Sequence, residues 1–228
     1  RLAIYDRPCL THEAGILGTY LDLSIQDRYS GTRIGQQLFD RVRDHLAQEG
    51  LLDRAAQFFC NSAAWVRLLR KDLIETIRRC HHLTGYDFLG AVDAHWHRTG
   101  YACGVLNEFL EFKPGDSLEE IRQYNAPTVL LLDGLKDYNL TRGTQLRRKI
   151  WISHFGANSL ENMLVEWRFR SKDEKILRSG RIAVGPILPG ELKPLSIVEI
   201  DIDSTFAIGK YSLDVSLSVN GKRFTNGW

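Results

Sequence analysis

The spacing of apolar residues changes once along the chain, near residue 126. Before that point apolar positions recur every three or four residues, as in Leu38, Phe39, Val42 and Leu46, which is the pattern of an amphipathic helix. It predicts a helix from Ser30 or Thr32 to Gly50, a shorter one over 51–59 and a third over 61–79, capped by Asn61 or Ser62.

Short apolar runs on either side of these helices predict strands. The first comprises Leu2–Tyr5 and continues toward Cys9–Thr11, and the second covers 85–93. Residues 94–116 contain Gly and Pro breakers and predict a loop, and Ser117 begins a capping box that opens a short helix. Strand, helices and strand in this order indicate α/β material.

After Pro127 the pattern becomes one of short strands separated by turns. Several segments alternate apolar and polar residues, and Asn220-Gly221 is a strong hairpin signal. The predicted strands cover 128–133, 145–154, 163–170, 175–183, 192–201 and 210–219, with a return strand over 222–225. Such a series predicts an all-β, immunoglobulin-like sandwich.

Composition and charge narrow the class of protein. The chain has 228 residues, of which 43% are hydrophobic and 25% charged, so it is neither a disordered chain, a collagen nor a coiled coil. A net charge of +2 gives no nucleic-acid footprint, and no apolar run reaches the roughly 18 residues of a membrane span. The sequence leaves the compartment open: periplasmic or extracellular for a longer parent protein, or cytoplasmic.

A carboxylate follows the first predicted strand in Thr11-His12-Glu13-Ala14-Gly15. Barrel enzymes place catalytic groups at the C-terminal ends of parallel strands, and a carboxylate there can attack the anomeric carbon of a sugar. The alternative is a surface Glu that caps the next segment.

A polar and aromatic group follows the second predicted strand in Asp93-Ala-His95-Trp96-His97. Trp96 could stack on a sugar ring, while Asp93 and His95 could bind its hydroxyl groups. The alternative is a solvated loop anchored by one Trp.

The crowded Cys and His residues raise the alternative of a metal site. The ligand types suit zinc, but their spacing matches no zinc motif, and we predict neither a metal nor a cofactor. The residues concerned are Cys80, His81, His82, His95, His97 and Cys103. A Cys–His nucleophile pair stays open, although no local signature supports one.

Three motifs in order resemble the C-terminal end of the catalytic barrel in glycoside hydrolase family 2, especially its bacterial β-galactosidase-like proteins. They are Pro8-Cys-Leu-Thr-His12-Glu13-Ala-Gly15, Thr84-Gly85-Tyr-Asp-Phe-Leu-Gly-Ala-Val-Asp93 and Gly104-Val-Leu-Asn-Glu-Phe109. The resemblance implies that Glu13 is the nucleophile after strand seven of a (β/α)₈ TIM barrel and that His12 binds substrate. It also implies that the acid/base carboxylate lies on strand four, before Arg1.

The sequence departs from this family in the eighth strand. Leu89 and Ala91 stand where family members commonly carry aromatic residues, so Trp96 becomes the alternative sugar platform. The Asn107-Glu108 pair resembles one that precedes the acid/base in many barrel glycosidases, but it lies after the last strand and is interpreted as structural.

Together these observations predict two parts: residues 1–126, the C-terminal portion of a glycosidase barrel, and 127–228, the sandwich. The parent would be a retaining β-glycosidase acting on carbohydrate, and the chain alone would be inactive, with exposed apolar surface that could drive self-association. Two alternatives remain: a non-catalytic carbohydrate-binding or interaction module built on the sandwich, and a complete small enzyme that uses the His/Cys group.

Overall fold

The computed structural model describes residues 7–94, 102–133 and 138–228, which form two compact units. The first comprises Arg1–Ile77 and His82–Ser117, and the second comprises Arg78–His81 and Leu118–Trp228.

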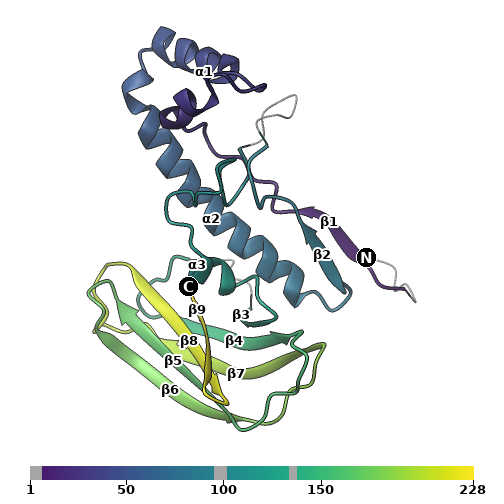
Figure 1. Ribbon diagram of the computed structural model, residues 1–228. Helices are drawn as coiled ribbons and strands as arrows, with labels where there is room; N and C mark the ends of the chain where they lie inside the picture. Colours follow the sequence, from purple (N-terminus) through teal and green to yellow (C-terminus); the bar gives the residue numbers. More distant parts are fainter. Residues whose placement is uncertain (1–6, 95–101, 134–137) are drawn as a thin grey trace. The chain divides into compact units, whose positions relative to one another are not determined.

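The first unit is a strand–helix–strand segment (Figure 1). Strands β1 (Leu10–Ala14) and β2 (Gly85–Phe88) pair in parallel. A parallel pair needs a long crossover, which is mostly helical here. The crossover contains the 3₁₀ helices η1 (Leu23–Tyr29) and η2 (Leu52–Arg54) and the helices α1 (Gln37–Gln48) and α2 (Ala55–Arg79). Within the described ranges, no helix is long and apolar enough to cross a membrane.

Several predicted boundaries in this unit are wrong. The helix predicted from Ser30 begins at Gln37, because Ser30 caps the C-terminus of η1 and residues 31–36 form turns in which Gly31 and Gly35 have positive φ. The two helices predicted over 51–79 are largely one, α2, because Ser62 lies inside it and donates its hydroxyl to the Phe59 carbonyl instead of capping. The strand predicted over 85–93 ends at Phe88, before Gly90 with φ 132°.

The strand predicted at Leu2–Tyr5 lies outside the described residues. Two parallel strands occur in many α/β folds, so the β1–β2 pair alone does not establish a (β/α)₈ barrel.

The second unit is a two-layer β-sandwich, as predicted (Figure 1). One sheet has the strand order β3-β4-β7 and the other β6-β5-β8-β9. The strands are β3 (Thr128–Leu132), β4 (Gln145–His154), β5 (Met163–Ser171), β6 (Ile176–Val184), β7 (Glu191–Asp201), β8 (Tyr211–Val219) and β9 (Lys222–Gly227). A short helix α3 (Leu118–Arg122) precedes them.

One continuous apolar core lies between the two sheets. Ile150 on β4 and Val198 on β7 face Val165 on β5 and Leu217 on β8, and all four are fully buried. Strand alternation sends every second side chain into this core, as on β5 and β8, whereas β3 is buried along its whole length. The side chain of Asn226 joins the two layers by donating to the Leu130 carbonyl at 2.7 Å.

The core predicts a contrast between two isoleucines of this unit. Ile150→Ala should lower the free energy of unfolding by about 2–5 kcal/mol, because Ile150 is fully buried and its loss leaves a cavity. Ile208→Ala should change it by less than about 0.5 kcal/mol, because Ile208 is fully exposed. Urea denaturation followed by β-sheet circular dichroism measures both, and equal effects would contradict the assigned core.

Candidate functional site

Glu13 lies near the C-terminal end of β1, beside Asp87 on β2. The β1–β2 register is irregular between Thr11 and Ala14, and Glu13 has a φ of 55°, in the left-handed region. L-residues enter this region at a cost in free energy, so the strand is locally deformed where the carboxylate projects.

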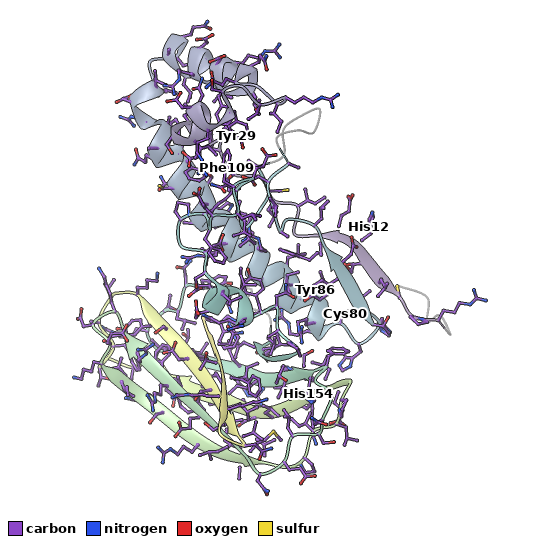
Figure 2. The ribbon with its side chains drawn as sticks, in the orientation of Figure 1. His12, Tyr29, Cys80, Tyr86, Phe109 and His154 are labelled. Atoms are coloured by element: carbon purple, nitrogen blue, oxygen red, sulfur yellow. The ribbon has the colours of Figure 1, made fainter. Side chains whose placement is uncertain are left out.

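Asp87 connects the two residues that the sequence selected on β1. Its Oδ1 accepts the backbone N–H of Glu13 at 2.9 Å and lies 3.1 Å from Nδ1 of His12. Because a carboxylate only accepts, Nδ1 carries the proton. His12 Nε2 lies 3.6 Å from Oε1 of Glu13, and His12 projects from β1 (Figure 2).

The three side chains are open to solvent: 82% of His12, 49% of Glu13 and 56% of Asp87 is exposed. Desolvation acts to raise the pKa of Asp87, but the hydrogen bonds from Glu13 N–H and His12 outweigh it and hold that pKa below its usual value. Asp87 is therefore an ionised acceptor, and Glu13 offers an accessible carboxylate.

Asp93 lies in a different group, in the interior of the first unit. Its carboxylate accepts the N–H of Gly104 at 2.6 Å and pairs with Lys113 Nζ at 2.8 Å, with both side chains buried. Lys113 Nζ also lies 3.1 Å from Thr19 Oγ1 and 2.9 Å from the Ala102 carbonyl. Burial lowers the pKa of Lys113, against the opposing effect of Asp93.

A hollow of about 350 Å³ lies beside this ion pair. It is lined by Tyr29, Thr32, Ile34, Val92, Asp93, Glu108 and Phe109. The hydroxyl of the buried Tyr29 donates to Glu108 Oε2 at 2.8 Å, and the Tyr29 ring meets Phe109 edge-on (Figure 2). Burial, and then the Glu108 carboxylate, raise the pKa of Tyr29 well above its usual value.

Asn107 stabilises the turn that carries Glu108. Its Oδ1 accepts the backbone N–H groups of Phe109 and Glu111, and its Nδ2 donates to the Glu111 side chain at 2.8 Å. These bonds within the turn account for Asn107 without a ligand.

The structure thus brings His12 and Glu13 together and places Asp93 in the buried ion pair. His95 and Trp96 lie outside the described residues. Sequence reasoning missed Asp87 and Lys113. Asp87 could have been found only from the β1–β2 register, and the sequence carries no signal that Lys113 is buried.

A metal site has no counterpart in the described ranges, where no group of three or more His, Cys, Asp or Glu could hold an ion. His95 and His97, two of the six residues of zinc-ligand type named above, lie outside those ranges. Cys80 and Cys103 are free thiols, and burial raises the pKa of Cys103.

Comparison by sequence finds one family match, which covers part of the chain. Residues 144–228 match a model described as "Domain of unknown function (DUF8488)". No curated protein matches the chain.

Comparison by structure finds likeness to glycoside hydrolases. The chain is similar to a β-D-mannosidase from Dictyoglomus thermophilum, with a TM-score of 0.55 and 12% identity over 76% of the chain and 20% of the mannosidase. An exo-chitosanase from Amycolatopsis orientalis has a TM-score of 0.48 and 12% identity, over 75% of the chain and 19% of that protein. A β-glucuronidase from glycoside hydrolase family 2 has a TM-score of 0.31 and 13% identity, over 44% of the chain and 10% of the glucuronidase.

The mannosidase likeness shows a shared fold, and the chain spans about a fifth of that enzyme's length.

The buried ion pair predicts a double-variant result. Lys113→Met should lower the free energy of unfolding by about 3–5 kcal/mol, because it leaves the Asp93 carboxylate buried without its cation. Asp93→Asn combined with Lys113→Met should cost less than Lys113→Met alone, since no uncompensated charge remains. Chemical denaturation followed by helical circular dichroism measures both, and a double variant less stable than Lys113→Met would contradict this prediction.

The raised pKa of Tyr29 predicts that the free energy of unfolding depends on pH in the alkaline range. Because its folded pKa is raised above 10.0, the folded protein keeps a proton that the unfolded chain releases. The stabilisation of the folded protein by this protonated phenol is present below pH 10.0 and is lost as the pH rises toward the raised pKa. The unfolding free energy of the unaltered protein should therefore fall more steeply above pH 10.0 than that of Tyr29→Phe.

Tyr20→Phe is the matched control, because the Tyr20 side chain is exposed. It should retain the steep fall of the unaltered protein. Identical slopes for the unaltered protein and Tyr29→Phe, measured by denaturation at a series of pH values, would count against a protonated, buried phenol.

Proposed function

We propose that the chain is the C-terminal part of a retaining β-glycosidase that resembles glycoside hydrolase family 2, and that the parent protein acts on carbohydrate. The observation that carries this proposal is the parallel β1–β2 pair, joined by a helical crossover and carrying the Glu13 carboxylate near its C-terminal edge. This is where (β/α)₈ enzymes build their active sites. The fold likeness to the β-D-mannosidase supports it.

In this proposal Glu13 attacks the anomeric carbon and forms a covalent glycosyl-enzyme, and water then releases the sugar with retained configuration. His12 lies within reach of the Glu13 carboxylate and binds substrate hydroxyl groups beside it. Asp93 supports the loop after β2 through Lys113, and His95 and Trp96 are proposed to contact the sugar.

A retaining mechanism also needs a general acid that is protonated before reaction. The carboxylates near the strand ends do not suit that role. The pKa of Asp87 is lowered, Asp93 is paired with the Lys113 ammonium, and Glu108 accepts the hydrogen bond of Tyr29. We therefore assign the acid to a segment of the parent that precedes Arg1 and expect the chain alone to be inactive.

Apolar side chains on the first unit support the same proposal. Leu10 on β1 is 67% exposed, and Trp65 on α2 is 61% exposed. Strands of a closed barrel are covered on both faces, so neighbouring βα units would bury such residues. In the isolated chain this surface is proposed to drive self-association.

The second unit fits the sandwich domain that accompanies such barrels. The chain passes from one sheet to the other between β4 and β5, between β6 and β7 and between β7 and β8, which supports an immunoglobulin-like Greek-key arrangement. The second candidate function is a carbohydrate-binding or interaction module formed by the sandwich. The family match covers 144–228 and leaves out the first unit, so the sandwich can be tested as a module of its own.

The proposal predicts how activity depends on Glu13. The chain alone should not hydrolyse aryl β-glycosides, whereas the longer protein encoded by the same reading frame should. In the longer protein Glu13→Gln should lower kcat at least about a thousandfold, the scale expected for loss of a catalytic group.

Glu49→Gln is the matched control, since Glu49 is an exposed carboxylate at the end of α1, and it should retain full activity. Turnover by the chain alone that Glu13→Gln abolishes would contradict the assignment of the acid. Full activity of Glu13→Gln in the longer protein would contradict the proposed nucleophile. Glycan binding by the chain, with an inactive longer protein, would favour the binding module.

A further inference from the structure

The outer face of the β6-β5-β8-β9 sheet contains a hollow of about 290 Å³ (Figure 1 shows the sheet). It arises from strand alternation: Val165, Trp167 and Phe169 of β5 belong to the core side, so the intervening residues of β5 line the outer face. The lining residues are Gln123, Glu166, Arg168, Arg170, Asp214, Val215, Ser216, Arg223, Thr225, Asn226 and Gly227.

Side-chain size explains why the sheet is hollowed at this point. Ser216 on β8 lies opposite Thr225 on β9, and Gly227 lies opposite Asp214. These short side chains flank long arginines on β5 and at the start of β9. The centre of the face is therefore low and its rim is basic.

Both carboxylates of the hollow are paired with arginines other than Arg168 and Arg223. Asp214 Oδ2 lies 2.5 Å from Nε of Arg170, which also pairs with Glu174. Glu166 Oε1 lies 2.6 Å from Nε of Arg181. Arg170 is shared by two carboxylates, so the four arginines and three carboxylates in and beside the hollow carry a net charge of +1.

Two arginines of the rim pair with no carboxylate in the described ranges. Arg168 lies directly opposite Asp214 in the register, but Arg170 occupies that carboxylate. Across the described ranges Arg168 forms no hydrogen bond or ion pair. Arg223 donates one N–H to Ser216 Oγ at 3.2 Å, which is a neutral partner.

We propose that this hollow binds an oxyanion, the carboxylate, sulfate or phosphate group of a small hydroxylated ligand. A guanidinium presents several N–H donors in a planar fork that matches such groups. The hydroxyls of Ser216 and Thr225 and the amide of Gln123 add neutral partners for ligand hydroxyl groups.

The residues that line the hollow suit an anionic ligand better than a neutral sugar. Among the described residues that line the hollow, none is aromatic, so a sugar ring has no stacking platform. Charge must then supply the affinity. The site lies entirely within the second unit and does not depend on the role proposed for Glu13.

The experiment is calorimetric titration of the full chain with four probes: D-glucuronate, inorganic sulfate, inorganic phosphate and, as the neutral control, D-glucose. At least one of the anions should bind, and its affinity should fall with rising ionic strength. Arg168→Gln and Arg223→Gln should each weaken that binding about tenfold or more, the scale of a lost charge-assisted hydrogen bond.

Arg147→Gln is the matched variant, because Arg147 is an exposed arginine of the other sheet, paired with Glu199, and it should leave the affinity unchanged. Arg168 has no partner to lose, so Arg168→Gln should keep the circular dichroism spectrum of the unaltered protein.

Equal binding of all three anions supports the site and shows that the oxyanion suffices, while preference for D-glucuronate supports it with a contribution from the sugar hydroxyls.

Three results would overturn the proposal. They are D-glucose binding as tightly as the best anion, an anion affinity that Arg168→Gln and Arg223→Gln leave unchanged, and no saturable anion binding in the millimolar range.

Discussion

The buried ammonium of Lys113 holds together the segments that follow the two parallel strands. Its partners are Asp93 and Ala102, in the segment after β2, and Thr19, in the segment after β1. One cation thus links the two connections that leave the parallel strand pair. Removing an ammonium from water is costly, and this geometry offsets the cost with one carboxylate and two neutral oxygens. The segments after β1 and β2 are therefore fixed relative to each other at this cation.

The two units are stabilised by different kinds of interaction. The sandwich is held by a continuous apolar core between paired sheets, so its stability is spread over many side chains. The first unit has a two-stranded sheet and a small hydrophobic cluster of Ile25, Tyr29 and Phe39, supplemented by the polar pairs Asp93–Lys113 and Arg70–Asp116. Buried polar pairs fix geometry more than they add stability, which suits a segment that carries loops.

The sequence predicted the sandwich well because strand alternation is local. Val165, Trp167 and Phe169 alternate with charged residues, and Asn220-Gly221 marks the turn between β8 and β9. The continuity of α2 was missed because Ser62 is a good cap in isolation, and only the surrounding helix makes it a back-bonding residue.

The candidate site was only partly predictable for a related reason. Glu13 and His12 could be selected from a short motif, but Asp87 joins them through strand register, which links residues more than seventy positions apart. Register is set by the whole crossover and not by neighbouring residues. The burial of Lys113 was equally hidden, because lysine is among the residues least often buried.

The left-handed backbone of Glu13 has a consequence for how this position can vary. A φ of 55° is comfortable for glycine, tolerable for asparagine and unfavourable by roughly 1–2 kcal/mol for most other L-residues. If only the backbone conformation at this position mattered, substitutions of Glu13 by Gly or Asn would therefore be favoured during evolution. The identity of residue 13 across related sequences consequently separates two histories: persistent Glu indicates a side chain retained for its carboxylate, and drift to Gly or Asn indicates a turn retained for its shape.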